Sequence, residues 1–145
     1  MMRYRKKQTR RGAALVELAL VLPIFFMVIL GTIEFGRALM TGQQLTGAVR
    51  MGARLASLDG STNLQVQTEV TNFCKSVLGQ TTDVTVLITI IPAPGNPDPL
   101  NNLSLATSGD LCKVNVTVPF NSVSLLRANY LADKSMHVSA SLPHE

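Results

Sequence analysis

The chain has 145 residues, a formal net charge of +4 and a pI of about 9.4, which is near the size of one small domain. The positive charge belongs to the first residues, because without residues 1–12 the formal net charge is −2. Beyond them there is no basic stripe with stacking aromatics, which argues against a nucleic-acid-binding protein.

The N-terminal part joins a basic leader, residues 1–12, to a long apolar segment. The leader contains no acid, and its basic side chains are Arg3, Arg5, Lys6, Lys7, Arg10 and Arg11. Residues 18–33 carry no charged side chain. Lys and Arg beside a membrane segment hold that end of the chain on the cytoplasmic side. We therefore expect a single-pass membrane protein with a cytoplasmic N-terminus.

The length of the membrane span decides which acid enters the bilayer. Residues 18–33 form about 24 Å of helix, whereas a hydrocarbon core is about 30 Å thick. Starting the span at Ala13 gives about 32 Å and brings Glu17 into or against the apolar layer, while a forward extension would bring in two charges. We predict a transmembrane helix over residues 13–33. A carboxylate there is unfavourable unless it is paired, so Glu17 either snorkels to the interface or meets a positive charge from a partner.

The residues at this junction resemble a known family. A basic leader that ends in Gly12, then four residues and Glu17 at the start of an apolar helix, resembles the prepilin class, whose members a membrane prepilin peptidase cuts and methylates. More narrowly, R-R-G-A-A-L-V-E-L-A-L-V-L-P over residues 10–23 and G-T-I-E-F-G-R over residues 31–37 resemble the TadE-like proteins of tight-adherence (Flp) pilus systems. The resemblance is strong over residues 10–56 and weak beyond them.

This resemblance implies a processing site at Gly12 and Ala13, with the cut after Gly12, and an assembly role for Glu17. The freed amine of a neighbouring subunit's Ala13 is then a natural counter-ion for Glu17. Leu18 stands where major Flp pilins usually have an aromatic residue, and the chain is too long for a major pilin, so we expect a minor pseudopilin.

The same resemblance implies partners and a location. The expected partners are a prepilin peptidase, other pilins and pseudopilins, the inner-membrane assembly platform and membrane lipid. The expected location is the bacterial inner membrane with a periplasmic C-terminal domain, or an extracellular pilus into which the protein is incorporated.

Two other readings of the N-terminal segment stay open. An uncleaved signal anchor would make the protein a membrane-anchored binding module. A secretory signal peptide would use Gly36-Arg37-Ala38 as its cleavage site, but the apolar run is longer than the usual h-region and Glu17 inside it is atypical.

The helical pattern continues past the membrane span. Apolar and small residues recur at spacings of three and four along one face, namely Leu45, Ala48, Val49, Gly52, Leu55 and Ala56. We predict one helix over residues 13–58, about 69 Å long, whose part 34–58 is a stalk. Ala48, Gly52 and Ala56 would let another helix or a sheet approach closely. Their partner is either a like subunit or the chain's own head.

The remainder, residues 59–145, is predicted to be an exported head domain. Its expected elements are a helix over 63–78, a central strand over 83–91, an exposed loop over 92–110, an alternating strand over 111–120, a short helix over 122–131 and a last strand over 136–142. The predicted fold class is α+β: a long N-terminal transmembrane helix that continues into a pilin-like head with a roughly three-stranded antiparallel sheet and one or two short helices.

The two cysteines, Cys74 and Cys112, are predicted to face one core. If the head is exported they can form a disulfide; otherwise they are two buried thiols. His137 and His144 do not have zinc spacing with them, and neither a nucleophile elbow nor a P-loop is present. The sequence thus predicts no enzyme, no cofactor and no metal. An enzyme would need a site that forms only in three dimensions.

Overall fold

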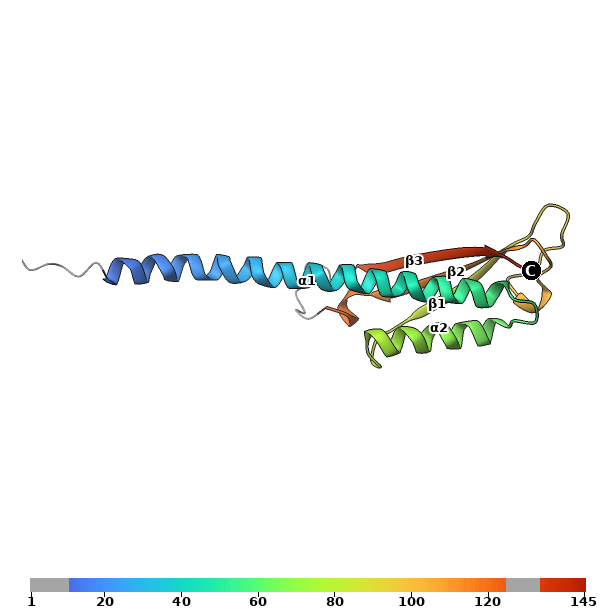
Figure 1. The fold of residues 1–145 in the computed structure, drawn as a ribbon, viewed down its shortest axis with the longest axis horizontal. Coiled ribbons are helices and arrows are strands. Elements are labelled where there is room, and N and C mark those ends of the chain that lie inside the picture. The colour runs from blue at the N-terminus through green and yellow to red at the C-terminus, as the bar shows by residue number, and fades with distance from the viewer. Residues whose placement is uncertain (1–10, 125–133) are drawn as a thin grey trace, which may run out of the picture. The chain divides into compact units, whose positions relative to one another are not determined.

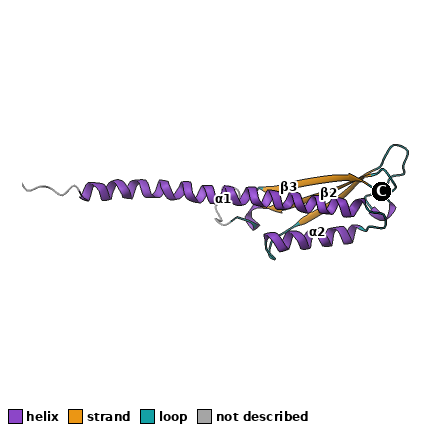
Figure 2. Cartoon of the chain, viewed as in Figure 1, coloured by secondary structure: helices purple, strands orange, loops and turns teal. Residues whose placement is uncertain are grey.

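The computed structural model describes residues 11–124 and 134–145. Helix α1 (Arg11–Ser57) runs through the boundary between two compact units, residues 1–35 and 36–145. The second unit adds the other elements, which are α2 (Asn63–Leu78), β1 (Thr85–Ile91), β2 (Leu111–Pro119), β3 (Ser135–Pro143) and two 3-10 turns, Leu103–Leu105 and Phe120–Ser122 (Figure 1, Figure 2). The predicted α+β, pilin-like fold is confirmed.

The three strands form one antiparallel sheet in the order β1-β2-β3 (Figure 1). The alternation predicted for β2 is observed, since one face is fully buried through Cys112, Val114, Val116 and Val118. Because β2 pairs on both sides, it is the central strand. The expectation that residues 83–91 form a central strand is therefore wrong: β1 lies at an edge, and its apolar Leu87 is 60% exposed.

In the second unit, one face of α1 packs against α2 and the sheet. Leu45, Ala48, Val49, Ala53 and Ala56 have no exposed surface. Gly52 is needed for this packing, because a Cβ on it would lie 2.5 Å from Val70 Cγ2 and 3.3 Å from Val114 Cγ1. The small-residue face thus serves the chain's own head.

Helix α2 has the bounds that the sequence predicts. The Thr62 side chain accepts a hydrogen bond from the backbone amide of Gln65 at 3.3 Å, which caps the start of the helix. Gly79, at φ 118°, follows its last turn, where a residue with a Cβ would be strained. Val66, Val70 and Cys74 are buried. The short helix expected over 122–131 lies mostly outside the described residues.

Candidate processing and assembly site

The part of α1 in the first unit has the composition of a membrane span. Among the described residues, α1 is the one helix long and apolar enough to cross a membrane, with a mean hydropathy of 2.7 over its most apolar window and none of that window buried. Leu20, Ile24 and Met27 are each more than 60% exposed. Fully burying such a side chain is worth about 1.5–3 kcal/mol, so this surface favours a lipid or protein environment over water.

Glu17 interrupts this apolar surface near the start of α1. It shares one face of the helix with Ala14, Leu18 and Val21, and these four residues line a shallow hollow of about 260 Å³. Within the described part of the chain, no cation pairs with the Glu17 carboxylate. On insertion scales, an acid at the bilayer centre costs about 3 kcal/mol. In a membrane, the Glu17 carboxylate would therefore need either a counter-ion from another molecule or access to the membrane–water interface.

The peptide bond between Gly12 and Ala13 lies in the first turn of α1. A side chain added at Gly12 would meet nothing within 4 Å, and Ala13 is exposed. The first amides of a helix have no partner inside it, so unwinding this turn breaks few hydrogen bonds. Among the described residues, nothing packs against the predicted processing site at Gly12. The site lies about one and a quarter turns before Glu17.

The two cysteines belong to the same buried core, Cys74 on α2 and Cys112 on β2. The structure holds both as free thiols, and the disulfide stays a prediction. Burial raises the pKa of the Cys74 thiol. Burial, and secondly the negative charge of Asp110, raise the pKa of the Cys112 thiol. Both groups are therefore poor nucleophiles at neutral pH.

Asp110 organises the loop before β2, a role that the sequence analysis missed. Its fully buried carboxylate accepts hydrogen bonds from the backbone amides of Ala93 and Thr107 at 2.9 Å each, from Asn96 Nδ2 at 2.7 Å and from Thr107 Oγ1 at 3.1 Å. These bonds hold the pKa of Asp110 well below its usual range. The only sequence signal is an acid directly before an alternating strand, after a loop rich in turn residues.

His144 joins the end of the sheet to the end of α1. It is buried, and its Nδ1 lies 3.2 Å from the carbonyl oxygen of Ala56 and 4.0 Å from Cys112 Sγ. A carbonyl oxygen only accepts, so this contact requires the hydrogen on Nδ1. The backbone amide of Glu145 also donates to Ser57 O at 2.9 Å. These hydrogen bonds attach the two C-terminal residues to the last turn of α1.

The described residues contain no group of three or more His, Cys, Asp or Glu side chains that could hold a metal ion. His137 lies apart from the cysteines on the outer face of the sheet. Its ring nitrogens contact Thr117 Oγ1 at 2.9 Å and Ser135 Oγ at 2.7 Å. Two hydroxyls suffice to explain the orientation of this exposed ring.

The fold and the apolar helix define the class of this protein: a pilin-like α+β protein with a candidate membrane helix near its N-terminus. Residues 12–54 match the model of the TadE-like protein family, so this part of the chain is similar to that family. The match begins at Gly12, the residue after which processing is predicted. No curated protein and no solved structure matches the chain.

Proposed function

We propose that this protein is a minor pseudopilin of a tight-adherence (Flp) pilus system. In this proposal it is made as a precursor, anchored in the inner membrane by residues 13–33 with its N-terminus in the cytoplasm, and cut after Gly12 by a prepilin peptidase. The role is structural. The peptidase supplies the chemistry, and this chain is its substrate.

The observation that supports the proposal is Glu17, which has no cation partner among the described residues and lies in the apolar part of α1, whose most apolar window is not buried. A helix that serves only as an anchor gains nothing from this acid, because the carboxylate opposes insertion. In a pilus, the freed amine of Ala13 of a neighbouring subunit would meet it. A charge-assisted pair in an apolar surrounding favours one register of assembly.

A second candidate function is a membrane-anchored binding module with an uncleaved signal anchor. The observation that favours it is the head itself, whose buried core lies wholly in the second unit. In this alternative, Gly12 and Glu17 have no special role.

The discriminating experiment combines an intact-mass measurement with two substitutions. We expect the protein recovered from bacterial membranes to begin at Ala13, with or without a methyl group on the new amine. Gly12→Ala should leave the precursor uncut, and Glu17→Gln should be cut but should reduce pilus formation at least about tenfold, since a factor of ten needs only about 1.4 kcal/mol.

Glu34→Gln is the matched control, because it removes an acid of the same helix that the proposal does not use for assembly. A native protein that begins at Met1, with pilus formation unaffected by Glu17→Gln, would leave the anchored binding module as the better description. A protein that begins at Leu39 would identify a secretory signal peptide.

A further inference from the structure

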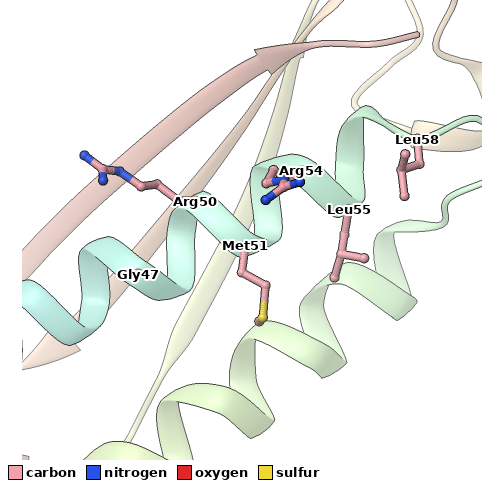
Figure 3. A pocket seen from close by; sticks show the side chains of 6 residues that line it. All are labelled: Gly47, Arg50, Met51, Arg54, Leu55 and Leu58. Carbon is pink, nitrogen blue, oxygen red and sulfur yellow. The ribbon is translucent and has the colours of Figure 1, made fainter.

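The second unit carries a groove along the exposed side of α1. It has a volume of about 530 Å³, and its lining, shown in Figure 3, consists of Gly47, Arg50, Met51, Arg54, Leu55 and Leu58. We refer to these six residues as the arginine groove. They recur at spacings of three and four, so they follow one side of the helix for about 16 Å, or three turns.

The floor of the arginine groove is apolar. Met51 and Leu55 project toward α2 and are half-buried (Figure 3), whereas Leu58 is 46% exposed at the end of the groove. At the other end, a side chain added at Gly47 would meet nothing within 4 Å. A second backbone can therefore come close at Gly47 and place apolar side chains over the floor.

The rim of the groove carries two unpaired positive charges. Arg50 and Arg54 are exposed, lie one helical turn apart, and have no carboxylate partner in the described part of the chain. Arg54 lies in the last turn of α1, where the helix dipole favours a cation. That effect fades beyond the last turn, so it does not explain Arg50. Both guanidinium groups are free to form bidentate pairs with carboxylates.

We propose that the arginine groove is a docking site for an amphipathic helix of another protein. The docking helix has an apolar stripe of about three turns and, along one side of it, two carboxylates four residues apart. The apolar stripe covers Met51, Leu55 and Leu58, and the carboxylates pair with Arg50 and Arg54. This arrangement is the helix-in-groove mode of recognition, with the charges setting the register and the choice of partner.

Charge complementarity excludes a second copy of this chain as the occupant, within the described residues. Its helices carry three acids, Glu17, Glu34 and Glu69. No two of them are three or four residues apart, so no described helix of a second copy offers the required pair.

The test measures binding of a designed peptide to the full chain in nanodiscs of zwitterionic lipid. The labelled peptide is a helix of about four turns with an apolar stripe and two Glu residues four positions apart; a second version has Arg in place of both Glu. By fluorescence anisotropy, we expect the Glu peptide to bind at least about tenfold more tightly than the Arg peptide, a difference of about 1.4 kcal/mol. The double variant Arg50→Glu with Arg54→Glu should reverse this preference.

The matched control is Lys113→Glu with Lys134→Glu. It changes the net charge by the same amount at side chains outside the groove, and it should keep the preference for the Glu peptide. Circular dichroism of each variant verifies that the head is folded, which is expected because all four side chains lie at least partly exposed.

Three results would overturn the proposal: equal binding of the two peptides, no binding of either, or the same response from the groove variant and the control variant. Anionic vesicles added as competitor distinguish a membrane surface from a helix. If these vesicles bind the wild-type chain in an Arg50- and Arg54-dependent way while neither peptide does, the groove recognises lipid and the proposal fails.

Discussion

At the scale of single residues, Asp110 connects distant parts of the proline-containing loop 92–110 through hydrogen bonds. Its carboxylate accepts four hydrogen bonds, two from backbone amides and two from side chains of the loop. The backbone of the same residue accepts a bond from the His144 amide at 2.7 Å. An ionised acceptor forms stronger hydrogen bonds than a neutral one, so these bonds depend on the charge of Asp110. We refer to the Asp110 carboxylate and the four hydrogen bonds that it accepts as the clamp.

The clamp gives a pH-dependent prediction. The pKa of Asp110 is lower in the folded protein than the value of about 3.9 expected in the unfolded chain. The unfolded state therefore binds the proton more readily, and the stability from Asp110 is present above about pH 4 and lost as the pH falls below it. We expect Asp110→Asn to lower the free energy of unfolding at pH 7 and to have a smaller effect at pH 3, as measured by urea unfolding followed by circular dichroism.

A loss of stability in Asp110→Asn that is equally large at both pH values would contradict this account. The control is Asp98→Asn, because Asp98 is exposed and its carboxylate accepts one bond, from the amide of Leu100 at 2.9 Å.

At the scale of secondary-structure elements, the contact of α1 with α2 and β2 depends on the absence of a side chain at Gly52. Alanine at an exposed helical position stabilises by about 1 kcal/mol relative to glycine. At Gly52 the added carbon would lie 2.5 Å from a methyl group of Val70, and a valine in a helix has little rotamer freedom to move away. Close packing here therefore outweighs helix propensity.

We expect Gly52→Ala to destabilise the head by about 1–3 kcal/mol, as is typical when a packed core is overfilled. Gly42→Ala is the matched control in the same helix, because nothing lies within 4 Å of the added carbon; it should be neutral or stabilising by up to about 1 kcal/mol. Thermal unfolding of both variants measures the difference. A Gly52→Ala protein as stable as the Gly42→Ala protein would refute the close contact.

The strands show that a sequence pattern can predict which face of a strand is buried but not where the strand lies in the sheet. The alternation in residues 111–118 identifies one buried face, and the structure buries that face. The run over residues 85–91 is apolar on both faces, which is typical of a strand covered on both sides, yet Leu87 and Ile91 are at least half exposed. Sheet order depends on which strands pair across the loop 92–110, and composition does not carry that information.

At the scale of the whole molecule, the apolar part of α1 and the head differ in the solvent that they require. Every described core residue lies in the second unit, and no described residue before Arg37 is buried. We therefore expect a chain that begins at Gly36 to fold and stay soluble without detergent, whereas the full chain requires a membrane or detergent. Gel filtration and circular dichroism in aqueous buffer measure both properties.

A truncated chain that aggregates, or that lacks helical and sheet signals, would show that the head needs residues 12–35 for its stability. The full chain in detergent serves as the reference for the expected spectrum.

The sequence by itself determined the candidate membrane span, the bounds of α2 and the α+β class, because hydropathy, helix caps and two-residue alternation are local properties of the chain. It also placed Gly12 and Glu17 relative to each other, since their spacing along one helix is fixed by helical geometry. Only the tertiary structure decided that Ala48, Gly52 and Ala56 pack inside the chain's own head, that β2 is central and that Asp110 clamps the loop. It also decided that Arg50 and Arg54 have no carboxylate partner among the residues that the structure describes. Each of these depends on residues brought together from distant parts of the chain, and neither spacing nor composition specifies which of them meet.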